Sequence, residues 1–313
     1  MFSLVDEIAD ATSNPTSPVD IHTPLASYKF INHLNEAVTA PLSLAYSLSG
    51  THFFAGSQNR IALFDLTYTD DPVRIIPTIP SRRNKLKGGG RGFKGAISAL
   101  SLSPVTGDIL AVGARTRSIG LYDANNGSEV THFSLPGTLL GRKSCSESLA
   151  SVMGDGVSSL KWSPCGTYLY VAERDSDVLL IYDARNFSLA LGYCAGRNAR
   201  SKQKLGFDIW TAGEGAHEVW AGGLDGRVRV WKAPYMKEGA VEADQVVNVS
   251  GAEEEMPVVG TLVHPSGSLA VTARGSLRIG TDDGEKAGIS RGGGTQPRFS
   301  ERGSLDILGL SGY

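Results

Sequence analysis

One short pattern recurs along this chain: a turn, an apolar strand, and then a strand that ends in an aromatic residue. Four copies lie at residues 49–65, 106–123, 165–183 and 226–232, and a weaker fifth copy begins at 264. A small sheet of this kind cannot bury both of its faces alone, so neighbouring copies must stack on one another. The repeat therefore predicts a series of stacked sheets rather than one continuous core.

The third copy shows the expected elements most clearly. Residues 157–162 and 168–172 have the pattern of strands, and Pro164 and Gly166 between them suit a tight turn. Residues 178–182 form a third expected strand, and a more variable fourth strand should follow it. No segment between the copies has a helical period of useful length, so the sequence predicts an all-β protein with antiparallel sheets.

A spacing of about 40 to 60 residues, with an aromatic residue and Asp at the strand end, is typical of WD-repeat β-propeller blades. Five blades are expected, which would be five of a seven-bladed ring. Their expected ranges are 37–80, 95–140, 155–200, 204–250 and 257–280. The corresponding domains are a disordered or remnant segment at 1–18, a partial propeller at 19–280, and a Gly-rich tail without structure at 281–313.

The composition excludes several classes of function. The formal net charge is −2, so no global field draws the chain to nucleic acid or to a membrane. The three cysteines are odd in number and lack metal-binding spacing, which favours a reducing compartment. The first residues do not resemble a signal peptide, and no stretch approaches eighteen consecutive apolar residues. The sequence therefore predicts no cofactor, no metal and no contact with a membrane.

Residues 25–36, with Asn32, His33 and Glu36, precede a blade-like stretch at 42–56. This arrangement resembles the telomerase Cajal body protein family, which includes a yeast WD-repeat homologue associated with pre-mRNA splicing. The resemblance runs from about residue 19 to 279. It implies a nuclear scaffold that binds small Cajal body RNAs or telomerase RNA and assists their assembly and localisation. Asn32, His33 and Glu36 would form a binding loop, or they would hold two blades together through hydrogen bonds to turns.

Members of that family carry about two further blades before this point, whereas residues 18–22 resemble only the last strand of a blade. We therefore expect a chain shortened at its front. Five blades closed by a borrowed strand is the competing interpretation.

A basic segment lies between the first two expected blades. It contains six cations and no acid, and these cations are Arg82, Arg83, Lys85, Lys87, Arg91 and Lys94. Six positive charges on a loop can neutralise phosphates and release counterions, which favours RNA binding. A nuclear import signal and a solvated surface loop remain alternatives. Residues 90–95 also satisfy G-x-G-x-x-G, but a strand rather than a helix should follow them, which argues against a dinucleotide site.

Two further pairs of arginines are candidates for phosphate contact. Arg115 and Arg117 lie in the tight turn of the second blade, and Arg227 and Arg229 alternate with valines on a strand of the fourth. Hydrogen bonding to blade turns or to Asp225 is the alternative for these arginines. The acidic residues between 238 and 255 could bind a basic partner or form a solvated loop.

No nucleophile has a sequence-evident base, so we expect a protein that is not an enzyme and has no small-molecule substrate. The favoured function is a scaffold for small nuclear RNA or for the proteins of its particles. Its expected location is the nucleus, with the cytoplasm as an additional location left open. The alternative is a protein-interaction platform that binds partners through its propeller faces and does not bind RNA directly.

Overall fold

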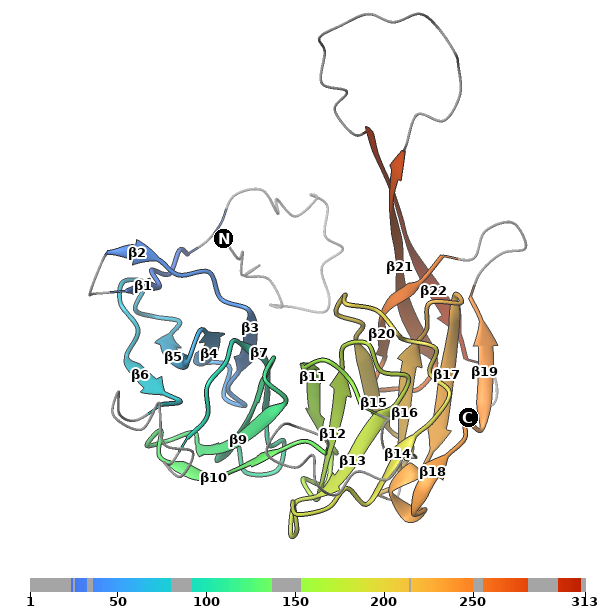
Figure 1. The fold of residues 1–313 in the computed structure, drawn as a ribbon, viewed down its shortest axis with the longest axis horizontal. Coiled ribbons are helices and arrows are strands. Elements are labelled where there is room, and N and C mark those ends of the chain that lie inside the picture. Colours follow the sequence, from blue (N-terminus) through green and yellow to red (C-terminus); the bar gives the residue numbers. More distant parts are fainter. Residues whose placement is uncertain are drawn as a thin grey trace, which may run out of the picture. The chain divides into compact units, whose positions relative to one another are not determined.

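The computed structural model describes residues 24, 26–32, 36–79, 92–136, 153–213, 215–249, 256–280 and 298–310. The chain forms two compact units, residues 1–135 and 136–313. Both consist of small twisted sheets (Figure 1). Among the described residues, the only helical element is one turn of 3-10 helix at Pro234–Met236.

The N-terminal unit contains two four-stranded antiparallel blades. Blade 1 consists of β3 (Ser43–Tyr46), β4 (His52–Ser57), β5 (Arg60–Asp65) and β6 (Arg74–Pro77). Blade 2 consists of β7 (Ile97–Leu102), β8 (Ile109–Ala114), β9 (Ser118–Asp123) and β10 (Glu129–Ser134). A short hairpin of β1 (Ile31–Asn32) and β2 (Ala37–Val38) precedes blade 1.

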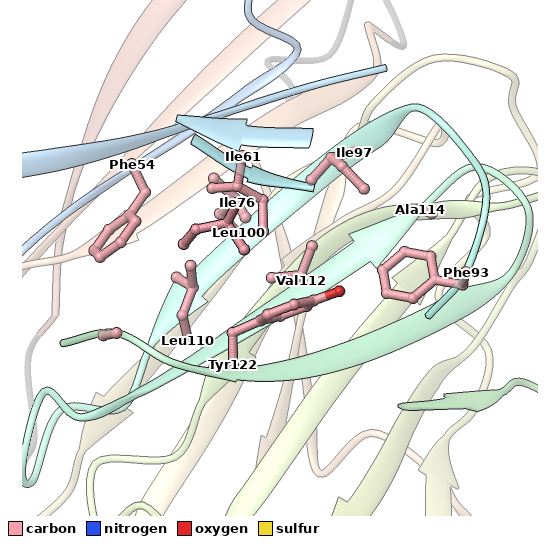
Figure 2. Close-up of a cluster of buried hydrophobic side chains, with 11 residues drawn as sticks. Phe54, Ile61, Ile76, Phe93, Ile97, Leu100, Leu110, Val112, Ala114 and Tyr122 are labelled. Atoms are coloured by element: carbon pink, nitrogen blue, oxygen red, sulfur yellow. The ribbon is translucent and has the colours of Figure 1, made fainter. Parts of the chain in front are cut away.

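The two blades of this unit pack face to face. Figure 2 shows the shared core, in which Phe54 and Ile61 of blade 1 lie near Leu110 and Val112 of blade 2. Gly56 lies at the closest approach of the blades, because a Cβ there would stand 2.6 Å from the Ile97 side chain. Apolar residues on alternate positions of each strand therefore join the blades into one unit.

The C-terminal unit contains three further blades. Blade 3 consists of β11 (Val157–Trp162), β12 (Tyr168–Glu173), β13 (Leu179–Asp183) and β14 (Gly192–Cys194). Blade 4 consists of β15 (Phe207–Thr211), β16 (His217–Gly222), β17 (Arg227–Lys232) and β19 (Gln245–Asn248). Blade 5 consists of β20 (Val258–Val263), β21 (Leu269–Gly280) and β22 (Arg298–Gly309). Blades 1 to 4 lie within the expected ranges, whereas blade 5 extends past residue 280 through β22.

A repeated turn closes the third strand of several blades. The carboxylates of Asp65, Asp123 and Asp183 each accept a hydrogen bond from the backbone N–H two residues later. Short polar side chains at turns commonly satisfy backbone groups in this way. In blade 4 this position is Lys232, whose backbone N–H donates to the distant Asp244 at 2.7 Å. The strand-end aspartates are therefore architectural.

Two expectations about the chain need correction. The sheets are not wholly antiparallel, because β18 (Gly239–Val241) adds to β14 as a parallel edge strand within the predicted acidic loop. The segment 281–313 is not wholly without structure, because β22 pairs with β21 along twelve residues. Figure 1 shows the far halves of these two strands extending past β20 as a ribbon. Residues 1–18 lie outside the described residues.

Candidate interaction surface of the N-terminal unit

The strands of the N-terminal unit end at two opposite edges, and one edge gathers predicted cations. At this edge β3 and β7 begin, and the β4–β5 and β8–β9 turns lie here. The residues 92–96, which lead from the basic segment into β7, run between the two turns. The cations of this edge are Arg60, Lys94, Arg115 and Arg117, which together are called the cationic rim.

Backbone hydrogen bonds hold the exit of the basic segment against both turns. Asn59 donates its N–H to the Gly95 carbonyl at 2.9 Å, and its side-chain oxygen accepts from the Gly95 N–H at 2.8 Å. The Arg115 N–H donates to the Ala96 carbonyl at 3.0 Å, and the Thr116 hydroxyl donates to the Lys94 carbonyl at 2.5 Å. The structure thus brings Lys94 beside the turn that carries Arg115 and Arg117.

The same turn geometry recurs in both blades of this unit. Asn59 and Arg117 occupy the left-handed region, with φ values of 58° and 61°. Asn adopts this conformation readily, whereas arginine does so less often. The Arg117 carbonyl also accepts a hydrogen bond from the Leu135 N–H at 2.8 Å. The positions of the rim cations are therefore set by backbone bonds.

The two edges of the unit differ in charge. Of the described residues, none at the cationic rim is acidic. The opposite edge carries Asp65, Asp70, Asp71, Asp108, Asp123 and Glu129. Lys94 and Arg115 are exposed, and Arg117 is half-buried. The unit is consequently polarised, with one edge suited to an anionic partner.

Arg60 joins the rim to the chain that precedes blade 1, and the sequence analysis missed it. Its guanidinium donates to the Thr39 hydroxyl at 2.9 Å and lies 5.3 Å from the centre of the Phe30 ring. A cation over an aromatic face is stabilised by the ring quadrupole. The signal that could have found Arg60 is its place as the first residue of a third blade strand, which Arg227 shares in blade 4.

The other predicted residues have different positions. Arg227 and Arg229 lie in blade 4 of the C-terminal unit, where Arg227 is exposed. Asn32 ends β1, and Glu36 is exposed with a φ of 54° beside β2. The remaining predicted site residues, Arg82, Arg83, Lys85, Lys87, Arg91 and His33, lie outside the described residues.

In the C-terminal unit, the edge at which β11 and β15 begin carries cations with acidic partners. Arg229 donates two hydrogen bonds to Asp225, at 3.1 and 2.8 Å, which is the alternative that the sequence left open. Burial raises the pKa of Asp225, but the hydrogen bonds and charge of Arg229 outweigh it, so the pKa lies below its usual value. Arg200 pairs with Asp177 at 2.7 Å.

One arginine of this edge is fully buried. The Arg197 guanidinium donates to the backbone carbonyls of Gly222, Leu205 and Gly206 at 3.2, 3.1 and 2.8 Å. Burial lowers its pKa to about 10, and the charge of Asp177 opposes that shift. Arg197 therefore has a structural role, since its donors satisfy carbonyl groups that water does not reach.

Residues 146–181 match the WD domain, G-beta repeat family. This match covers the first two strands of blade 3 and part of the third, and the five blades are those of a WD-repeat β-propeller. A Schizosaccharomyces pombe protein named guanine nucleotide-binding protein negative regulator 1 is 28% identical over 208 residues. Those residues are 66% of this chain, and the chain spans 46% of that relative.

The solved structures include a similar chain in the hydrazine synthase of Kuenenia stuttgartiensis. The TM-score is 0.53 at 12% identity, over 85% of this chain and 62% of that chain. At this identity the likeness concerns the fold alone.

The described residues contain no group of His, Cys, Asp or Glu side chains that could hold a metal ion. They also contain no helix that is long and apolar enough to span a membrane.

Proposed function

We propose that this protein is a non-enzymatic WD-repeat scaffold whose N-terminal unit binds RNA. The contact surface consists of the cationic rim and the basic segment at 82–94 that leads into it. The supporting observation is the polarity of the unit, since six of its seven described acids gather at the opposite edge, and the seventh, Glu36, lies on the β1–β2 turn. A polyanion would meet attraction on one side only and would release counterions on binding.

The class of RNA is a further part of the proposal. The resemblance of residues 25–36 and 42–56 to the telomerase Cajal body protein family supports a small nuclear or Cajal body RNA as the client. A role in the assembly, localisation or splicing function of such particles follows from that client. A nuclear location is proposed on the same basis, and the basic segment would also suit an import signal.

A protein-only platform is the second candidate. Stacked blades offer broad faces for protein partners, and the fission yeast relative carries the name of a negative regulator of a guanine nucleotide-binding protein. On that candidate, the cationic rim would meet an acidic protein surface, and no RNA would bind directly.

Crosslinking of RNA to the protein in cells, followed by immunoprecipitation and sequencing, tests the first candidate. We expect one class of small nuclear RNA to be enriched. Replacement of Arg82, Arg83, Lys85 and Lys87 by Ala should remove most of that enrichment. An RNA yield no higher than that of an untagged control would contradict RNA binding and favour the protein-only platform.

A matched variant separates a specific surface from a general loss of positive charge. It replaces four cations of the C-terminal unit, namely Arg200, Lys202, Lys204 and Arg227, by Ala. This variant also removes four positive charges, so its change in net charge equals that of the first variant. The four side chains are exposed. We expect this variant to keep its RNA, because acidic residues of that edge already pair with Arg200 and Lys202.

A further inference from the structure

The turn between β4 and β5 holds the chain around the basic segment through one neutral residue. Asn59 donates its N–H to the Gly95 carbonyl at 2.9 Å, and its Oδ1 accepts from the Gly95 N–H at 2.8 Å. The Asn59 carbonyl accepts from the Thr78 N–H at 3.0 Å, and the Thr78 carbonyl accepts from the Phe93 N–H, also at 3.0 Å. Asn59 thus binds the chain both before the basic segment, at Thr78, and after it, at Gly95.

The turn between β12 and β13 of blade 3 contacts the chain before blade 4 in a similar way, but with carboxylates. Asp175 donates its N–H to the Ser201 carbonyl at 2.9 Å, and Asp177 Oδ1 accepts from the Ala199 N–H at 2.7 Å. Asp175 has a φ of 54°, and Asn59 has a φ of 58°. The two turns therefore share a left-handed residue and a contact with the following chain, but they differ in charge.

The carboxylates of the blade 3 turn also bind the cations that lie next to them. Asp177 pairs with Arg200 at 2.7 Å, and Asp175 lies 3.6 Å from the Lys202 ammonium group. A side-chain amide offers a similar oxygen acceptor but carries no charge. Asn59 can therefore accept a backbone hydrogen bond without neutralising the cations beside it.

We propose that Asn59 is a specificity-determining residue of the RNA-binding surface, because its neutral amide fixes the chain beside Lys94 and leaves the cationic rim free of negative charge. This inference rests on the proposed function. Asn59 is half-buried and directly precedes Arg60, and its Oδ1 accepts from the residue that follows Lys94. A carboxylate in its place would lie among cations, would stay ionised at neutral pH and would repel RNA phosphates.

Binding of a labelled oligouridylate to the full chain, followed by fluorescence anisotropy at a series of salt concentrations, tests the inference. Asn59→Asp keeps an oxygen acceptor for the Gly95 N–H, and Asp175 shows that aspartate adopts the same backbone conformation in this chain. The variant should bind about threefold more weakly at moderate salt. The plot of log affinity against log salt concentration should become shallower by about 0.7, which corresponds to one phosphate contact of a single strand.

Two further variants separate the added charge from the loss of a contact. Asn59→Gly tolerates the left-handed backbone and removes the side-chain acceptor without adding charge, so it should leave the slope of that plot unchanged. Gln58→Glu adds a carboxylate to an exposed position of the same turn and leaves Asn59 in place. It should weaken binding and make the plot shallower even where Asn59→Asp folds poorly.

Asn186→Asp is the matched control in the C-terminal unit. Asn186 is exposed on the turn after β13, and its Oδ1 accepts from the Ser188 N–H at 3.1 Å. The variant therefore makes the same change of side chain and of net charge, and an oxygen acceptor for the backbone N–H is again retained. It should change neither the affinity for oligouridylate nor its salt dependence.

The outcomes separate the inference from the proposed function. Unchanged binding in both Asn59→Asp and Gln58→Glu would overturn the inference while RNA binding at the rim stands. Equal losses with an unchanged slope in Asn59→Asp and Asn59→Gly would also overturn it, and so would an equal loss in Asn186→Asp. Failure of the unmodified protein to bind oligouridylate would overturn the proposed function and the inference together.

Discussion

The corresponding edges of the two units both carry several cations but differ in what surrounds these cations. In the N-terminal unit, Lys94 and Arg115 are exposed, and none of the described residues of that edge is acidic. In the C-terminal unit, Arg229 is paired with Asp225, Arg200 with Asp177, and Arg197 is buried among carbonyl groups. Cations at an edge therefore do not make a binding surface by themselves. The distribution of acceptors around them decides whether they are available.

The largest expected effect is on the stability of the C-terminal unit. Arg197→Met should lower its free energy of unfolding by about 3 kcal/mol, because two buried carbonyls and the part-buried carbonyl of Gly206 would lose this donor. Urea unfolding followed by tryptophan fluorescence measures this unit alone, since Trp162, Trp210, Trp220 and Trp231 all lie in it. An unchanged unfolding midpoint would contradict a structural role for Arg197. The contrast between this buried arginine and the exposed cations of the cationic rim would then be lost.

A second prediction concerns stability at low pH, and it again applies to the C-terminal unit. His217 is buried, its Nε2 lies 2.8 Å from the Tyr170 hydroxyl, and its ring stacks on Tyr235 at 4.3 Å. Burial lowers the pKa of His217 to about 4, from 6.5. The unfolded chain thus binds the proton more strongly, and stability present above pH 6.5 is lost as the pH falls towards 4.

The expected loss for the C-terminal unit is about 1 to 3 kcal/mol over that pH range. Urea unfolding at a series of pH values, read by tryptophan fluorescence, measures it. His217→Gln cannot titrate and should flatten the pH dependence over this interval. An equally steep dependence in that variant would assign the effect to other groups.

A third prediction compares the two edges as RNA-binding surfaces. Replacing Lys94, Arg115 and Arg117 by Ala should weaken RNA binding about tenfold at moderate salt. The plot of log affinity against log salt concentration should become shallower by about 2, if each cation accounts for one phosphate of a single strand. Fluorescence anisotropy with labelled RNA gives both values. The matched triple variant of Arg200, Lys202 and Arg227 should change neither the affinity nor its salt dependence. Equal losses in both variants would contradict the claim that the two edges differ as RNA-binding surfaces.

The smallest effect should be the same in both units. Asp123→Ala in blade 2 and Asp183→Ala in blade 3 each remove the acceptor of a strand-end turn. We expect a loss of about 1 kcal/mol in each case, because the freed N–H groups are partly accessible to water. Thermal melting followed by circular dichroism measures both variants. A much larger loss in one unit would mean that the repeated turn is not equivalent in the two.

Much of the fold could be predicted because it is encoded locally. Alternating apolar residues mark the strands, and the turn glycines and strand-end aspartates mark where the strands end. The Gly-rich composition after residue 280 led to the error in the tail. The alternation at Leu305, Asp306 and Ile307 is the signal that could have located β22. Its pairing with β21 spans a long insertion, which local pattern does not reveal.

The candidate site could be predicted only in part. The sequence indicated three cations of the rim separately, namely Lys94, Arg115 and Arg117. Their proximity could not be predicted, because it depends on contacts of Asn59 and Thr116 with the chain between the blades. Arg60 was missed, because its contact with Phe30 arises only when the N-terminal chain packs on blade 1.

The sequence by itself determined the class of the fold, the number of blades and the residues of their turns, since these depend on strand period and backbone preference within a few residues. Only the tertiary structure decided which cations are available and which are neutralised. That decision depends on which charged groups come within pairing distance, as Arg200 and Asp177 do across 23 positions of the chain, and such distances arise from packing rather than from any local pattern.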